Sequence, residues 1–169
     1  MEHPLEFEKK MLQVHKPNRV NPAALESVEG IRITPEWKIV YPAASDIVLV
    51  NGAKDLQDYF QVSMNVDLAL ETAEESGEKT IFITTDNSLQ PRSFRIQVSD
   101  RIVITGVDPR YTAQGGYALE DILNMNEAPV ISPRDETKQM RFSMRTINGG
   151  MHDEHYPDAH LQQIAHAGM

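Results

Sequence analysis

The sequence contains no cysteine among its 169 residues. Disulfide scaffolds, thiolate metal sites and cysteine nucleophiles are therefore excluded. Basic residues are scarce, since 16 lysines and arginines stand against 25 aspartates and glutamates, and the net charge is −9. A nucleic-acid-binding protein needs a basic surplus to neutralise phosphates, so we expect no nucleic-acid partner.

Long apolar runs are missing as well. No run approaches the roughly 20 apolar residues of a membrane-spanning helix, so we expect no membrane partner. Residues 1–6 have neither the basic nor the apolar part of a secretory signal, which predicts a cytoplasmic location. The glycine-rich nucleotide loops and the Gly-x-Ser-x-Gly hydrolase motif are also absent from the sequence. We therefore expect no cofactor.

The regular part of the sequence lies between residues 31 and 131. Short β-branched or alternating segments predict strands at 31–33, 37–41, 47–50, 66–70, 80–84, 94–98 and 102–104. Apolar residues at helical spacing predict helices over 53–64, with Asn51 as its N-cap, and over 110–125. The order of these elements favours an α+β domain, with a mostly antiparallel sheet and two helices on one face.

A glycine pair, Gly115 and Gly116, lies inside the second predicted helix. Each glycine there costs about 1 kcal/mol relative to alanine. We expect a close approach of this helix to the sheet as the compensation.

The two ends of the chain differ from this domain. Residues 1–30 are polar and interrupted by prolines, and predict an N-terminal arm. Residues 132–139 predict a linker, and residues 140–169 a strand, a loop and a helix that ends before Gly168. A βα unit cannot bury both its faces alone. We therefore expect residues 140–169 to be the first βα fragment of a TIM barrel that continues beyond residue 169.

Three stretches occur in an order that resembles a known family. They are 47–50 followed by 52–60, 101–106 followed by 115–123, and 141–145. Together they resemble the N-terminal non-catalytic domain of the family-20 glycoside hydrolases, the β-N-acetylhexosaminidases, or of the family-67 α-glucuronidases. The resemblance implies an accessory domain that supports a catalytic barrel. The carbohydrate substrate and the catalytic carboxylates would belong to that barrel, and the fragment itself would be inactive.

The resemblance also suggests site residues. Arg145 matches the arginine that follows the first barrel strand and holds sugar hydroxyls in family 20. Asp153 and Glu154 form an adjacent acidic pair, but two residues separate them from Gly149-Gly150, unlike the family's catalytic motif. We therefore assign no catalytic residue. Because barrel active sites lie at the C-terminal ends of the strands, we expect Arg145, Asp153 and Glu154 to bind substrate.

Potential metal ligands are dense near the C-terminus. They are His152, Asp153, Glu154, His155, His160 and His166. A zinc site needs three or four converging side chains, and His160 and His166, six residues apart, do not share a helix face. We therefore expect no metal site, although a small metal-dependent hydrolase that uses this histidine-rich loop is a third hypothesis.

The second hypothesis belongs to another class of protein. The chain would be a stand-alone, non-enzymatic carbohydrate-binding or interaction module. The apolar face of its last helix would then need cover from a second copy, which implies a homodimer.

Overall fold

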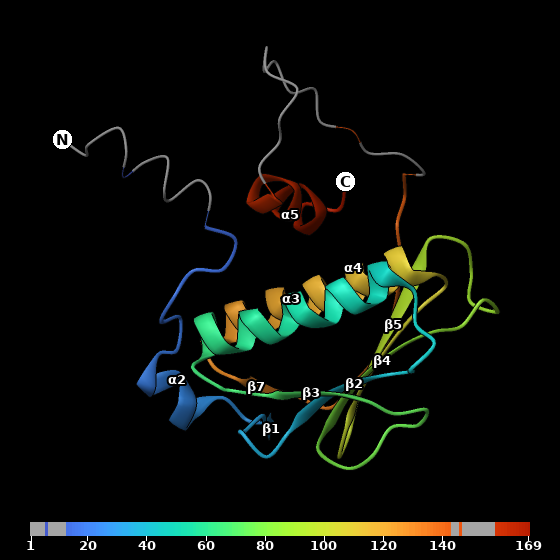
Figure 1. Ribbon diagram of the computed structural model, residues 1–169. Helices are drawn as coiled ribbons and strands as arrows, with labels where there is room; N and C mark the ends of the chain where they lie inside the picture. The colour runs from blue at the N-terminus through green and yellow to red at the C-terminus, as the bar shows by residue number, and fades with distance from the viewer. Residues whose placement is uncertain (1–5, 7–12, 143–145, 147–157) are drawn as a thin grey trace.

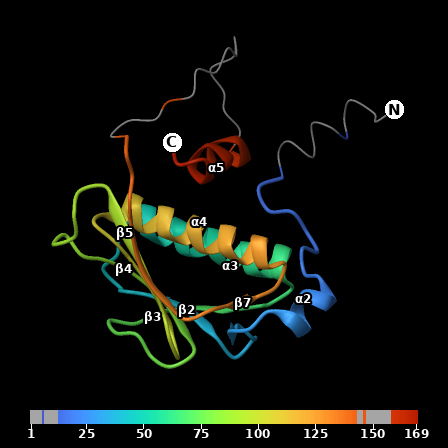
Figure 2. The same ribbon diagram turned by 180° about the vertical axis from the view of Figure 1, so that it is seen from behind.

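The computed structural model describes residue 6, residues 13–142, residue 146 and residues 158–169. In chain order, the elements are α2 (Pro22–Ser27), β1 (Ile31–Arg32), β2 (Lys38–Tyr41), α3 (Ile47–Met64), β3 (Ala69–Thr72), β4 (Thr80–Thr85), β5 (Ser93–Val98), β6 (Ile102–Gly106), α4 (Pro109–Asn126), β7 (Val130–Ile131), β8 (Arg134–Gln139) and α5 (Asp158–His166). A sheet forms one layer, α3 and α4 lie side by side on one of its faces, and α5 lies on the outer side of these helices (Figure 1). The view from behind shows the same three layers (Figure 2).

The α+β class and the two helices on one face are confirmed. The main sheet has the strand order β3-β2-β4-β6-β5-β8, and β1 and β7 form a separate antiparallel pair. The main sheet does not have the expected, mostly antiparallel pairing, because β2–β3, β2–β4 and β4–β6 are parallel and, within this sheet, only the two pairings of β5 are antiparallel. The physical reason is that α3 carries the chain back across the sheet, so that β3 runs in the same direction as β2.

Helix α3 begins earlier than the sequence predicts. The segment 47–50, expected as a strand, forms the first turn of this helix. Asp46 caps it, since its carboxylate accepts a hydrogen bond of 2.8 Å from the backbone N–H of Val48. Ile47 is 65% exposed and Leu49 is buried, so this apolar run is not covered on both sides as a central strand would be.

Helix α4 packs closely on the sheet at Gly115. A Cβ atom on this residue would lie 2.5 Å from Cγ2 of Ile104 in β6, so there is no room for a side chain. The close approach expected for the glycine pair is confirmed at this position. Gly116 has a different environment, because a Cβ there would meet nothing within 4 Å.

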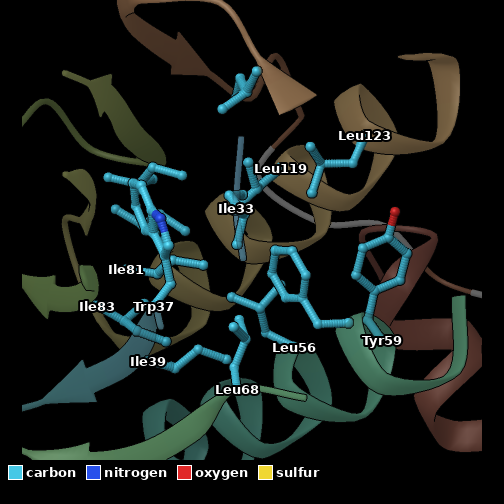
Figure 3. Packing of buried hydrophobic residues seen from close by; sticks show 14 of the residues in the cluster. Ile33, Trp37, Ile39, Leu56, Tyr59, Leu68, Ile81, Ile83, Leu119 and Leu123 are labelled. Carbon is cyan, nitrogen blue, oxygen red and sulfur yellow. The ribbon is translucent and has the colours of Figure 1, made fainter. Parts of the chain in front are cut away.

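The core lies between the sheet and the two helices. The sheet residues Ile39, Ile81 and Ile83 are at most 3% exposed. They belong to one cluster with Leu56 of α3 and Leu119 of α4 (Figure 3). Complete burial of such a side chain contributes about 1.5–3 kcal/mol.

The segments that flank the core domain are partly fastened to it. Residues 134–139, expected as part of a linker, form the edge strand β8, which pairs with β5 from Arg134↔Val98 to Gln139↔Ser93. In the N-terminal arm, the backbone N–H of Arg19 donates to the carbonyl of Ser63, and the Ser63 hydroxyl donates to the carbonyl of Lys16. The arm is therefore attached to the C-terminal end of α3.

The last helix ends as the sequence predicts. Gly168 follows α5 with φ +79°, and its N–H donates to the carbonyl of Ala165 at 2.9 Å. Met140, Arg141 and Phe142, the described start of the predicted barrel strand, are not in a strand. None of the helices in the described ranges is long and apolar enough to cross a membrane.

Candidate functional site

The substrate-binding residues predicted from the sequence, Arg145, Asp153 and Glu154, lie outside the described residues. Their assignment therefore stays a prediction. The described residues contain a different group of charged side chains, which lie far apart in the sequence.

Four titratable side chains meet between the two central helices and the chain ends. His15 comes from the N-terminal arm, Asp55 from α3, Glu120 from α4 and His166 from the last residue of α5. We call these four residues the His–carboxylate cluster. Their side chains are 4%, 9%, 5% and 20% exposed, respectively, so three of them are removed from water almost completely.

Close contact between α3 and α4 places the two carboxylates of the cluster near each other. A Cβ on Gly52 would lie 3.3 Å from the Cβ of Ala113, so the two helices nearly touch at this level. Asp55 lies three residues after Gly52, and Glu120 lies seven residues after Ala113, so each stands on the same face as the contact residue of its helix. Both carboxylates are thereby directed toward the side of the helix layer that faces away from the sheet.

Contacts with α3 and α4 hold the two histidine rings in place. The side-chain amide of Gln114 donates to the carbonyl of Ala165 at 3.0 Å and so attaches α5 to α4. The ring of Tyr117 stacks on the His166 ring with centroids 4.0 Å apart. The His15 ring makes edge contacts with Tyr59 at 5.6 Å and with His166 at 5.3 Å.

Asp55 joins the two histidines through their Nε2 atoms. Its Oδ2 lies 2.6 Å from Nε2 of His166, and its Oδ1 lies 3.4 Å from Nε2 of His15. The first distance is that of a strong, charge-assisted hydrogen bond. Burial acts to raise the pKa of Asp55, but the interactions with His15 and His166 outweigh it and hold this pKa at about 2.

Glu120 faces the opposite nitrogen atoms of the same rings. Its Oε2 lies 3.4 Å from Nδ1 of His166 and 3.9 Å from Nδ1 of His15. Burial raises the pKa of Glu120 well above its usual range, and the negative charges of Asp55 and Asp121 raise it further.

Two atoms of the cluster lack hydrogen-bond partners among the described residues. They are Oε1 of Glu120 and Nε2 of His15, and both are buried. A buried polar atom without a partner costs about 1–3 kcal/mol. Such a cost in a cluster of ligand-type side chains indicates a site for a proton, a water molecule or a cation.

The cluster lies next to two cavities of different size. A small one of about 70 Å³ is bordered by His15, Glu120, His166 and Tyr59. A larger, open hollow of about 640 Å³ lies between α3, α4 and α5, with Asp55 at its margin. The small cavity is large enough for water but not for a sugar ring, because sites for organic ligands usually measure about 300–1,000 Å³.

One member of this cluster is visible in the sequence. His166 was among the candidate metal ligands, whereas His15, Asp55 and Glu120 were not. Glu120 had one visible sign, since it follows the apolar Leu119 and precedes Ile122 and Leu123 on a helix that otherwise faces the core. The meeting of residues 15 and 166 depends on how both ends of the chain pack, which no local pattern indicates.

Three solved glycoside hydrolase structures match parts of this chain. A GH20 β-N-acetylhexosaminidase from Streptomyces coelicolor A3(2) matches with a TM-score of 0.52 and 17% identity, over 75% of this chain and 27% of that chain. A β-N-acetylhexosaminidase from Bacteroides fragilis NCTC 9343 matches with a TM-score of 0.43 and 18% identity, over 65% and 20%. A GH138 enzyme targeting pectin rhamnogalacturonan II matches with a TM-score of 0.44 and 17% identity, over 59% and 15%.

These matches cover a minor part of each solved chain. No protein-family model and no curated protein sequence matches this chain. At such low identity the likeness to the Streptomyces enzyme concerns the fold alone. The chain thus shares its fold with a portion of a glycoside hydrolase.

Proposed function

We propose that residues 31–139 form a non-catalytic accessory domain of a glycoside hydrolase, whose catalytic barrel lies beyond residue 169. The observation that carries this proposal is the fold likeness to a GH20 hexosaminidase, of which this chain matches only 27%. The three sequence stretches that resemble family 20 lie within the same domain or directly after it. The likeness to family-67 α-glucuronidases rests on the sequence resemblance alone.

The small size of the cavity beside the cluster favours an accessory role for this domain. The buried His–carboxylate cluster adjoins a cavity of about 70 Å³, which is too small for a glycoside. The domain instead offers exposed apolar side chains to a neighbour, among them Ile47 at 65% and Val48 at 45%. In this proposal the carbohydrate substrate binds to the barrel, with Arg145 as a contact from this chain.

The test compares the whole gene product with residues 1–169. We expect the whole product to release nitrophenol from a nitrophenyl N-acetylglucosaminide or glucuronide, and residues 1–169 to release none. Deletion of residues 31–139 from the whole product should lower its melting temperature. A native gene product with a mass near 19.1 kDa would overturn the proposal, because no catalytic barrel would then follow.

One observation favours the alternative of a stand-alone carbohydrate-binding module. The open hollow of about 640 Å³ between α3, α4 and α5 has the size of a ligand site and is lined by polar residues such as Asn51, Asp58 and Gln162. Calorimetric titration of residues 1–169 with mono- and oligosaccharides tests this function. Binding that Gln162→Ala abolishes would support it, and the absence of heat with all sugars would refute it.

A further inference from the structure

We propose that His15, Glu120 and His166 bind one divalent transition-metal ion, with Zn²⁺ as the best fit, and that this ion fastens the N-terminal arm and α5 to the helix pair. The proposal is independent of the glycoside hydrolase assignment. It differs from the expectation of no metal site, which was based on the histidine and acidic side chains near the C-terminus.

The spacing of the three side chains suits ligands of a common ion. One ligand-type atom from each lies within 4.8 Å of the others. Ligands about 2.0–2.1 Å from a tetrahedral Zn²⁺ are roughly 3.3 Å apart. The distances of 3.4 Å and 3.9 Å from Glu120 Oε2 to the two Nδ1 atoms are close to this spacing, and the larger is too long for a hydrogen bond.

Asp55 supplies the outer interaction that such a site requires. Histidines that bind metal ions usually donate their other ring N–H to a carboxylate, which fixes the tautomer and the ring orientation. Asp55 lies next to Nε2 of both histidines, at 2.6 Å and 3.4 Å. The hydrogen bond to Asp55 holds the proton of His166 at Nε2, so the lone pair of its Nδ1 atom is free to bind the ion beside Glu120. In the proposed site His15 likewise keeps its proton at Nε2, which lies 3.4 Å from Oδ1 of Asp55 without forming a hydrogen bond, and binds the ion through Nδ1.

The unpaired atoms and the charges of the cluster also point to a cation. The Glu120 side chain is only 5% exposed, and its buried Oε1 atom has no hydrogen-bond partner among the described residues. An ion with two positive charges offsets the charges of ionised Asp55 and Glu120. Two imidazoles and a carboxylate are a usual donor set for zinc, and the absence of cysteine excludes thiolate ligands.

The adjacent small cavity leaves room for a fourth ligand. Its volume is about 70 Å³, whereas a water molecule occupies roughly 30 Å³. A water molecule there completes four-coordination. The role that we assign to the ion is to hold the N-terminal arm and α5 on the helix pair.

The first experiment titrates metal-free residues 1–169, prepared with EDTA, with ZnCl₂ in a calorimeter and follows the melting temperature. We expect one ion per chain at micromolar or lower Kd, a rise in melting temperature of several degrees, and reversal by EDTA. Titration with Co²⁺ should give the visible absorption bands of a four-coordinate site without sulfur ligands. If folded chain shows no heat and no stabilisation with Zn²⁺, the proposal is wrong.

Variants locate the ion. His15→Ala and His166→Ala should each abolish the one-to-one binding, and Asp55→Asn should weaken it about 10–100-fold. His160→Ala, on the same helix as His166, and the double variant His152→Ala/His155→Ala are the controls and should bind like the unaltered chain. Loss of binding in either control, with retention in His15→Ala, would assign the ion to the C-terminal histidines and overturn the proposal.

Glu120→Gln separates metal binding from a merely structural role. The amide keeps the shape of the side chain and removes the buried acid. The metal-free variant should melt at the same or a higher temperature than the unaltered chain, because the cost of burying a carboxylate is gone. It should nevertheless lose the stabilisation by Zn²⁺. A Glu120→Gln variant that is still stabilised by Zn²⁺ would contradict a role of Glu120 as a ligand.

Discussion

Single glycines differ sharply in what they do, even when they are neighbours. Gly115→Ala should destabilise the protein by about 1–3 kcal/mol, since the new methyl group would overlap Ile104 in β6. Gly116→Ala should leave stability unchanged or raise it by up to about 1 kcal/mol, because its Cβ meets nothing and alanine favours the helix. Urea unfolding of both variants checks this pair. Equal effects of the two changes would show that α4 does not approach the sheet as described.

Asp100, in the turn between β5 and β6, has a pKa that its neighbour controls. Hydrogen bonds from Arg101 and then from Ser99 lower this pKa to about 2. Since the folded-state pKa lies below the unfolded value, ionised Asp100 contributes stability above about pH 4. This contribution disappears as the pH falls toward 2, and it is small because the pair is exposed.

Arg101→Gln should move the pKa of Asp100 back toward 3.8. An NMR titration of the Asp100 carboxyl carbon between pH 1.5 and 6 measures the midpoint directly. Arg95→Gln, in the neighbouring strand, is the control and should leave that midpoint in place. An unchanged midpoint in Arg101→Gln would contradict the hydrogen bonds from the guanidinium.

The start of helix α3 is set by its N-cap residue, Asp46. Asp46→Ala should cost about 1 kcal/mol, because the N–H of Val48 loses its acceptor. Asn51, the N-cap expected from the sequence, lies inside the helix and is exposed. Asn51→Ala should therefore be neutral or slightly stabilising. Thermal unfolding of the two variants distinguishes a helix capped by Asp46 from one capped by Asn51. If Asn51 were the cap, Asn51→Ala would be the more destabilising of the two changes.

The elements that periodicity predicts correctly are those with a buried face. Leu56, Phe60 and Met64 stand on the core side of α3, and the alternation at Phe94 and Ile96 marks β5. The segment 47–50 was misassigned because β-branched residues predict strands regardless of an aspartate cap before them. Strand β8 was not predicted because its sequence lacks the apolar residues that indicate a strand. It contains no apolar residue, and its place at the sheet edge needs none.

At the scale of the whole molecule, the exposed apolar start of α3 should matter only in the presence of a further domain. Ile47→Asp should change the stability of residues 1–169 by less than about 0.5 kcal/mol, because Ile47 is 65% exposed and an acid suits the first turn of a helix. In the whole gene product the same change should lower the melting temperature, since a charge would enter the proposed contact with the barrel.

Met125→Lys is the matched control for this change. Met125 is 78% exposed and lies in the last turn of α4, where a cation is favourable. It should be neutral in both the fragment and the whole product. Differential scanning calorimetry of the four variant proteins measures this. Equal melting temperatures for Ile47→Asp and Met125→Lys in the whole product would contradict a contact between the start of α3 and the barrel.

The sequence predicted the fold class better than the candidate site. Alternation and helical spacing are local, and they sufficed for the α+β class and for both central helices. The His–carboxylate cluster is non-local, because His15 and His166 stand near opposite ends of the chain and Asp55 and Glu120 on different helices. The direction of strand pairing was also not predictable locally, since it depends on where α3 returns the chain.

The position of the cluster has a consequence for the entropy of the unfolded chain. A link between residues 15 and 166 closes a loop that contains both central helices and the whole sheet. Loop closure removes more disorder from the unfolded state as the loop grows, although only logarithmically. The unfolded chain would have to close this loop before it could bind the ion, so the ion should bind the folded chain far more tightly and stabilise it by mass action. The ion would also suppress the fraying of both chain ends at the same time.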